Sequence, residues 1–247
     1  MSQNDILFEN VSKSFPLYHH MSGGVKNFIF HFPKAVYSLR HSHFEALRNI
    51  SFEVPKGESL GIVGRNGAGK STLLGLIAGV LRPSSGKMLI RDRVSPLLEL
   101  GGGFHTELSG RENIMLNGVL MGMLRSEVKH KIDEIIAFSE LEEFIDQPIR
   151  TYSSGMLARL GFSVVAHLEP KIILIDEVLA VGDASFRNKC IKKMVEFKKM
   201  GATIVFVSHS APDVAMICDR VLWIENHEVK KIGRTDEILR EYSAVVE

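Results

Sequence analysis

The stretch that decides the fold is Gly64-Arg65-Asn66-Gly67-Ala68-Gly69-Lys70-Ser71-Thr72. It matches the pattern G-x4-G-K-[ST] and lies between an apolar segment typical of a strand, residues 59–63, and a segment with helical apolar spacing, residues 70–80. Glycines let consecutive backbone N–H groups surround a phosphate, and the following helix adds the positive end of its dipole. The stretch therefore predicts a nucleotide-phosphate cradle in an α/β fold. We call residues 64–72 the phosphate loop.

The chemistry of such a cradle assigns roles to its side chains. We expect Lys70 to reach the β- and γ-phosphates of a bound nucleotide and Ser71 to ligate Mg²⁺. The residues expected to bind the nucleotide are Gly64, Asn66, Gly67, Ala68, Gly69, Lys70, Ser71 and Thr72.

A phosphate loop also needs a distant carboxylate to hold the metal. Four apolar residues, 172–175, predict a buried strand that ends at Asp176 and Glu177. We expect Asp176 to ligate Mg²⁺ and Glu177 to accept a proton from the attacking water.

The composition is that of an ordinary globular protein. The chain has 247 residues, 45% of them apolar, and 30 basic side chains face 29 acidic ones. A net charge of +1 provides no overall field for nucleic acid, so no nucleic-acid partner is expected. The two cysteines, Cys190 and Cys218, have no metal-ligand spacing and are interpreted as core residues in a reducing compartment. No apolar run approaches the ~20 residues that a membrane-spanning helix requires.

The hydrophobic pattern predicts one domain with two parts. Strands dominate the start, helical spacing dominates the middle, and strands alternate with helices in the last third. We expect a core formed by residues 1–95 and 168–247 and a helical subdomain formed by residues 96–167. Residues 16–44 fit neither period and are interpreted as an insertion. The predicted strands are 6–15, 47–54, 59–63, 87–90, 171–175, 202–207, 220–224 and 229–232, and the predicted helices are 70–80, 111–123, 126–138, 184–200, 211–217 and 235–242.

The segment Tyr152-Ser153-Ser154-Gly155-Met156 resembles the signature motif of ATP-binding cassette (ABC) ATPases, which is more often L-S-G-G-Q. Residues 176–183 stand where that family usually has D-E-P-T-S-A-L-D. Together with residues 99–113, these features make the chain similar to the ATPase subunit of exporters for O-antigen, capsular polysaccharide or teichoic acid. We call residues 152–156 the signature segment.

The resemblance implies a P-loop NTPase of ABC type, with a mixed sheet core, an antiparallel β part at the N-terminus and a helical subdomain. It implies a homodimer paired head to tail, in which Ser153, Ser154 and Gly155 of one copy contact the γ-phosphate held by the other. Asp183 matches an aspartate that communicates across the dimer, and His209 matches a histidine that orients the attacking water. The catalytic residues implied are therefore Glu177, His209 and Lys70. On structural grounds alone, Ser154 could instead be a helix N-cap, and Asp183 could be an N-cap in addition to its role across the dimer.

The sequence departs from the family pattern at two places. The loop that usually carries a glutamine has none, and Glu99 is our substitute as a ligand for Mg²⁺ or its water. Phe15 best fits the aromatic residue that stacks on adenine, although Tyr18 and Phe44 compete with it. No C-terminal carbohydrate-binding domain is expected, because the sequence ends soon after the last predicted helix.

The resemblance implies an ATPase that powers export of a lipid-linked polysaccharide through a separate integral membrane permease, from the cytoplasmic face of the inner membrane. The alternatives are a soluble ABC protein of translation or DNA repair and a nucleotide-binding regulatory module without turnover. The insertion is cationic and is either a solvated loop or a contact with the membrane or a pyrophosphate-linked lipid. A metal site at His41 and His43 has no evident third ligand.

Overall fold

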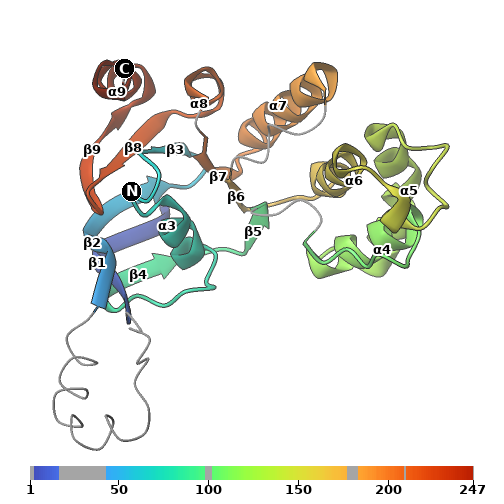
Figure 1. The fold of residues 1–247 in the computed structure, drawn as a ribbon, viewed down its shortest axis with the longest axis horizontal. Coiled ribbons are helices and arrows are strands. Elements are labelled where there is room, and N and C mark those ends of the chain that lie inside the picture. Colours follow the sequence, from blue (N-terminus) through green and yellow to red (C-terminus); the bar gives the residue numbers. More distant parts are fainter. Residues whose placement is uncertain (1–2, 17–42, 98–101, 177–182, 209, 247) are drawn as a thin grey trace, which may run out of the picture.

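The computed structural model describes residues 3–16, 43–97, 102–176, 183–208 and 210–246. Two sheets form the core of this part of the chain (Figure 1). An antiparallel sheet has the strand order β2-β1-β4, and a larger mixed sheet has the order β5-β6-β7-β3-β8-β9. The strands are β1 (Asn4–Pro16), β2 (His43–Pro55), β3 (Ser59–Val63), β4 (Ser85–Ile90), β5 (Val94–Leu97), β6 (Ile172–Asp176), β7 (Thr203–Val207), β8 (Arg220–Glu225) and β9 (Glu228–Arg234).

The central strands of the larger sheet are buried on both faces, which explains their continuous apolar sequences. In β6, Ile172 and Leu174 pack in one hydrophobic cluster, and Ile173 and Ile175 pack in another. The first cluster includes helix α3 (Lys70–Ile77) and residues of the antiparallel sheet. The second includes α7 (Ala184–Lys199), α8 (Ala211–Ile217) and α9 (Thr235–Val246). Strand β6 is therefore covered by different elements on its two faces.

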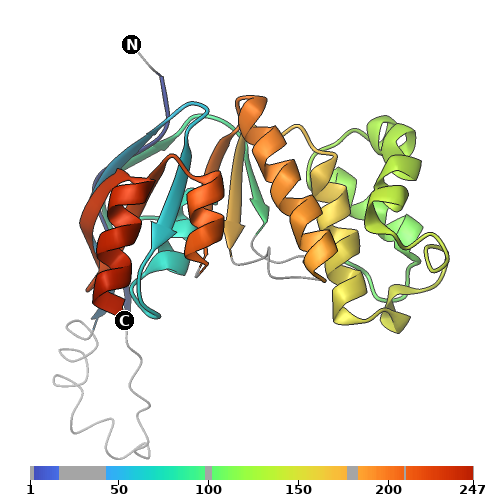
Figure 2. The same ribbon diagram turned by 90° about the horizontal axis from the view of Figure 1, so that it is seen from above.

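Three helices from the middle of the chain form a separate group beside the sheets: α4 (Gly110–Leu120), α5 (Arg125–Ser139) and α6 (Ser154–Ala166). Figure 2 shows α7 lying between this group and α8. The entry into α4 is fixed by a capping box, in which the Glu112 backbone N–H donates to the Ser109 hydroxyl and the Glu112 carboxylate accepts from the Ser109 N–H. A short 3-10 helix, Ile149–Thr151, precedes the signature segment.

Most predicted elements are confirmed within a few residues of their observed ends. The prediction that the insertion begins at Pro16 and extends to Phe44 is wrong at both ends, because Pro16 pairs with His43 and Phe15 with Phe44 in the β1–β2 ladder. Strand β5 was not predicted, since it is only four residues long and contains Pro96. The remaining residues of the insertion, 17–42, lie outside the described residues.

The prediction that Cys190 and Cys218 are core residues is confirmed, because both are buried. Cys218, however, follows the last residue of α8 and is not part of that helix. Burial raises the pKa of the Cys190 thiol to about 12, so the thiolate is scarce near neutral pH. Within the described ranges, no helix is both long enough and apolar enough to span a bilayer.

Candidate functional site

Strand register brings the two predicted halves of a phosphate and metal site to one edge of the sheet. In the parallel ladders, Asp176 at the end of β6 is level with Val207 of β7, and Val207 is level with Ile62 of β3. The phosphate loop begins directly after β3 ends at Val63. Because the carboxyl ends of parallel strands meet at one sheet edge, Asp176 faces the same crevice as the phosphate loop.

Two glycines of the loop are required by close backbone contacts. A Cβ atom on Gly69 would lie 2.5 Å from the Ala46 carbonyl oxygen, and the φ angle of Gly69 is +109°. A Cβ atom on Gly64 would lie 2.4 Å from the Ile224 carbonyl oxygen. Strands β2 and β8 therefore press against the two ends of the loop and hold it compact. Helix α3 starts at Lys70, so its first N–H groups point toward the loop.

The Lys70 ammonium lies against the backbone of its own loop. It donates hydrogen bonds to the carbonyl oxygens of Gly64, at 2.8 Å, and Arg65, at 3.1 Å. These contacts hold a positive charge where the loop opens. A lysine ammonium is a point charge with N–H donors, which suits it to phosphate oxygens.

A pocket of about 360 Å³ lies over the loop and includes the predicted metal carboxylate. Ser71 and Asp176 both line it, one from the start of α3 and the other from the end of β6. A hydroxyl and a carboxylate are oxygen ligands of the kind that Mg²⁺ prefers, so the donor set fits that ion. The lining residues are Phe44, Ala46, Asn66, Gly67, Gly69, Lys70, Ser71, Thr72 and Asp176.

Only one of the predicted aromatic candidates lines this pocket among the described residues. Phe15 does not line it, and its ring lies 4.9 Å from the Lys13 ammonium. Phe44, its partner in the β1–β2 ladder, does line the pocket and keeps 45% of its surface exposed. The structure therefore favours Phe44 over Phe15 as the aromatic residue nearest the phosphate loop, and Tyr18 lies outside the described residues.

Two residues of the phosphate loop that were predicted to bind the nucleotide do not line the pocket. Ala68 is buried, and Gly64 packs against the end of β8. Sequence reasoning missed Ala46, which is buried and presents its carbonyl to Gly69. No motif marks an alanine in a strand, so its role becomes visible only from the loop contact.

The signature segment lies in the helical group, away from the phosphate loop and α3 (Figure 1). Ser153 is the N-cap of α6, and its hydroxyl accepts a hydrogen bond from the Met156 N–H at 3.2 Å. Ser154 is the first residue of the helix, and both serines are exposed. The structure thus assigns the N-cap role to Ser153 rather than Ser154. It does not bring Ser153, Ser154 or Gly155 to the phosphate pocket of the same chain.

Asp183 is the N-cap of α7, and its carboxylate accepts from the Phe186 N–H at 2.9 Å. It also forms an ion pair with Arg159, which projects from α6. The Phe186 N–H, followed by the positive charge of Arg159, holds the pKa of Asp183 below its ordinary value. This ion pair connects the start of α7 to the helix that carries the signature segment.

Three predicted site residues, Glu99, Glu177 and His209, lie outside the described residues. Strand β6 leads into Glu177 and strand β7 ends two residues before His209, at Val207. The assignments of Glu99, Glu177 and His209 all remain predictions. Within the described part of the chain, no cluster of three or more His, Cys, Asp or Glu side chains has the geometry of a metal site.

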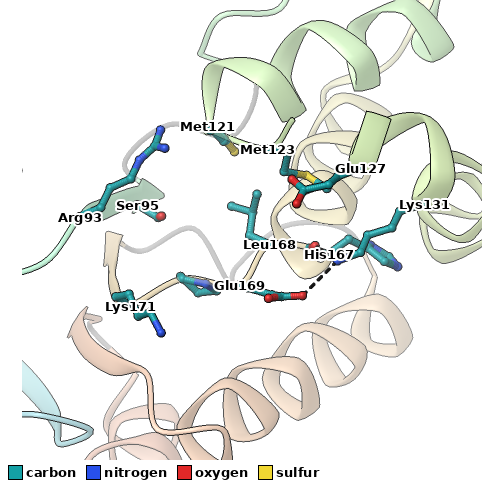
Figure 3. A pocket seen from close by; sticks show the side chains of 12 residues that line it. Arg93, Ser95, Met121, Met123, Glu127, Lys131, His167, Leu168, Glu169 and Lys171 are labelled. Atoms are coloured by element: carbon teal, nitrogen blue, oxygen red, sulfur yellow. Dashed lines mark hydrogen bonds and ion pairs between the residues drawn. The ribbon is translucent and has the colours of Figure 1, made fainter. Parts of the chain in front are cut away.

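A second cavity, of about 170 Å³, lies where β5 meets the α4–α5 and α6–β6 connections (Figure 3). Its wall carries both signs of charge, and Lys131 donates to the His167 carbonyl at 3.2 Å and to the Glu169 carboxylate at 3.4 Å. Burial lowers the pKa of His167, which favours the neutral ring. This cavity shares no lining residue with the phosphate pocket and is separate from it.

Comparison with known proteins identifies the class. The ABC transporter family profile matches residues 47–180. The O-antigen export system ATP-binding protein RfbB of Klebsiella pneumoniae is 57% identical over 96% of both chains. The teichoic acids export ATP-binding protein TagH of Bacillus cereus is 44% identical over 97% of this chain and 42% of its own length.

A solved structure has the same fold. The ATP-binding cassette MJ0796, in a dimeric post-hydrolysis state bound to ADP and Pi, aligns with a TM-score of 0.73 and 20% identity. The alignment covers 93% of this chain and 98% of that structure. The predicted fold class is confirmed. The chain belongs to the ABC transporter family, as one of its nucleotide-binding ATPase subunits.

Proposed function

We propose that this ATPase powers the export of a lipid-linked, O-antigen-like polysaccharide through a separate integral membrane subunit. The observation that carries the proposal is the pocket in which Lys70, Ser71 and Asp176 meet, in a chain 57% identical to an O-antigen export system ATP-binding protein. The output of such a subunit is motion of its membrane partner, and no residue of the pocket needs to contact the sugar. We place the chain on the cytoplasmic face of the inner membrane as a peripheral subunit.

The phosphate loop binds the nucleotide through its backbone. N–H groups of the loop and of the first turn of α3 donate to the phosphate oxygens, and Lys70 exchanges its carbonyl partners for the β- and γ-phosphates. Phe44 contacts the base at the open end of the pocket. Preorganised donors of this kind stabilise the charge that develops during phosphoryl transfer and require little rearrangement.

Ser71 and Asp176 would hold Mg²⁺ between the phosphate loop and β6. When bound, the ion neutralises charge on the β- and γ-phosphates. Glu177 follows Asp176 directly and accepts the proton of the attacking water, and His209 orients that water. Glu99 would be a further ligand for the ion or its water, in place of the usual glutamine.

The complete site requires two copies of the chain. Ser153, Ser154 and Gly155 are exposed or half-buried at the start of α6, outside the phosphate pocket of their own chain. The start of a helix presents N–H donors suited to a phosphate anion. We therefore propose a head-to-tail homodimer in which the helical part, residues 96–167, of each copy covers the nucleotide held by the core, residues 1–95 and 168–247, of the other.

The polysaccharide has close alternatives. A relative at 44% identity is a teichoic acids export ATP-binding protein, so a teichoic acid or a capsular polysaccharide is the second candidate cargo. The candidates can be distinguished by measuring polysaccharide export in cells from which the gene for this ATPase subunit has been deleted. Surface O-antigen should return when this chain is supplied with its own membrane subunit, and return of only a teichoic acid or capsule would replace the first candidate.

Turnover is tested by phosphate release from Mg-ATP. We expect the purified chain with its membrane subunit to release phosphate, and Glu177→Gln to bind ATP and stop turnover. The exposed residue Glu142, converted to Gln, is the matched control and should keep full activity. A wild type as slow as Glu177→Gln would replace the ATPase proposal with a regulatory module that binds ATP without turnover.

A further inference from the structure

The turn between β8 and β9 lies beside the phosphate pocket and belongs to neither the phosphate loop nor the signature segment. Asn226 and His227 connect the paired residues Glu225 and Glu228, so the turn has two residues. Their φ angles are +51° and +68°, which places both in the left-handed region. Such hairpin turns favour Asn followed by Gly. Histidine at the second position has a backbone cost that glycine would avoid, and such a cost is a reason to ask what the ring does.

The His227 ring contacts the aromatic residue of the pocket. Its centroid lies 5.3 Å from that of Phe44, and the ring planes are at 86°. This is a T-shaped arrangement, which aromatic pairs prefer. Its Nδ1 atom lies 3.2 Å from the Ala46 carbonyl oxygen. A carbonyl only accepts, so Nδ1 carries the proton and donates. This hydrogen bond fixes the orientation of the ring against Phe44.

The turn is also tied to β2 through its backbone and flanks. The Arg48 N–H donates to the His227 carbonyl at 2.8 Å, and the Arg48 guanidinium bonds Glu45 at 2.8 Å and Glu228 at 3.1 Å. The Ala46 carbonyl that accepts from His227 is the one that Gly69 of the phosphate loop approaches. One carbonyl therefore lies between the turn and the loop.

We propose that His227 is a positioning residue for the nucleobase: it holds the Phe44 ring at a fixed place relative to the phosphate loop, so that a purine can stack on it. The T-shaped contact covers at most one face of Phe44, which keeps 45% of its surface exposed. His227 then acts on the base alone and leaves phosphate binding unchanged. This inference rests on the proposed ATP site and names a residue that positions its base.

The test compares two ligands that differ only in the nucleoside. Calorimetry with Mg²⁺ measures the Kd of ATP and of tripolyphosphate for the wild type and for His227→Gly and His227→Asn. Both substitutions suit a left-handed turn position and remove the ring contact. We expect the ATP Kd to rise about two- to tenfold, the range of an aromatic pair, and the tripolyphosphate Kd to stay within about twofold. Asn226→Gly, which changes the same turn without a ring, should leave both values unchanged.

A double substitution shows whether His227 acts through Phe44. If it does, His227→Asn weakens ATP binding in the wild type and adds nothing in a Phe44→Leu background. Equal losses for ATP and tripolyphosphate, no loss for ATP, or fully additive losses with Phe44→Leu would each overturn the inference and leave the nucleotide site intact. A wild type that binds neither ligand would overturn the proposed nucleotide site itself, and the role of His227 with it.

Discussion

The phosphate loop and the signature segment differ in how far their own chain completes them. The loop is enclosed: β2 and β8 press on Gly69 and Gly64, and Lys70 already contacts two loop carbonyls. The signature segment is open: Ser153 caps α6, while Ser154 is exposed and lies outside the pocket. In the proposed site, the first region binds a phosphate with residues of its own chain, and the second presents its donors to another molecule.

This difference indicates that folding of a single chain is enough to form the phosphate loop, whereas the signature segment needs a second molecule to contact it. Close packing makes the loop intolerant of small changes, whereas exposed residues of α6 tolerate substitution unless a second molecule contacts them. Substitutions in the loop should therefore affect binding in a single chain. Substitutions in the signature segment that spare its cap should affect only the assembled ATPase.

The largest effect is expected from the ammonium of the enclosed region. Lys70→Ala removes the charge that we propose contacts the β- and γ-phosphates, and ATP turnover should fall by about 100-fold or more. Steady-state phosphate release measures it. The exposed lysine Lys87, changed to Ala, is the control and should have no effect. Wild-type turnover in Lys70→Ala would contradict a role for the loop in phosphate binding.

The next effect tests whether backbone contact closes the loop. Gly69→Ala places a methyl group 2.5 Å from the Ala46 carbonyl at a φ of +109°, and we expect a cost of about 2 kcal/mol and weaker ATP binding. Gly67 also has a positive φ, +79°, but a Cβ atom there meets nothing within 4 Å. Gly67→Ala should cost about 1 kcal/mol. Thermal unfolding and calorimetry with ATP compare the two, and equal effects would show that packing against β2 is unimportant.

A smaller effect is expected in the signature segment, where two substitutions distinguish the role of a helix cap from a role in the assembled ATPase. Ser153→Ala removes the bond from the Met156 N–H and should destabilise the chain by about 1 kcal/mol, measured by denaturant unfolding. Ser154→Ala removes an exposed hydroxyl and should change stability by less than about 0.5 kcal/mol. Its turnover should nevertheless fall in the assembled ATPase. Normal turnover in Ser154→Ala would exclude its hydroxyl as a phosphate contact.

The smallest effect is a pH dependence at the junction between α6 and α7. The pKa of Asp183 is lowered in the folded chain, so its charged form adds stability above the unfolded pKa near ~3.9 and loses it as pH falls through the folded value. Asp183→Asn keeps an N-cap but loses the ion pair with Arg159. Its Tm should lie below that of the wild type at pH 7, and the difference should shrink below about pH 4. A difference that grows on acidification would contradict this sign.

The strand–loop–helix unit and the position of Asp176 could be predicted from the sequence because a short run of neighbouring residues defines each of them. Glycine spacing defines the loop, and four apolar residues before a carboxylate define a buried strand end. It left the aromatic residue open, because a long segment separates Phe15 from Phe44 and hides their pairing in the β1–β2 ladder. Position in the chain favoured Phe15, whereas the lining of the pocket favours Phe44, and the role in base stacking stays a prediction.

Residues that act through distant contacts were beyond local patterns. Ala46 and His227 come from strand and turn positions that carry no motif. Tertiary packing alone brings the Ala46 carbonyl to Gly69 of the loop and the His227 ring to that carbonyl. Asp183 was predicted with two possible roles, and the structure shows the capping one directly. Its role between two subunits stays a prediction, since that role requires a second chain.

The most direct test of the account mixes two inactive chains. In a head-to-tail pair, Lys70→Ala breaks the phosphate half of a site and Ser154→Arg, on an exposed residue, blocks the signature half. A mixed pair of these variants then contains one doubly broken site and one intact site. Phosphate release with the membrane subunit present should rise from background in each variant alone to about a quarter of the wild-type rate in the mixture, because about half of the pairs are mixed and each mixed pair has one intact site of two. Background release in the mixture, with pairing of the two variants verified, would contradict a site shared between two copies.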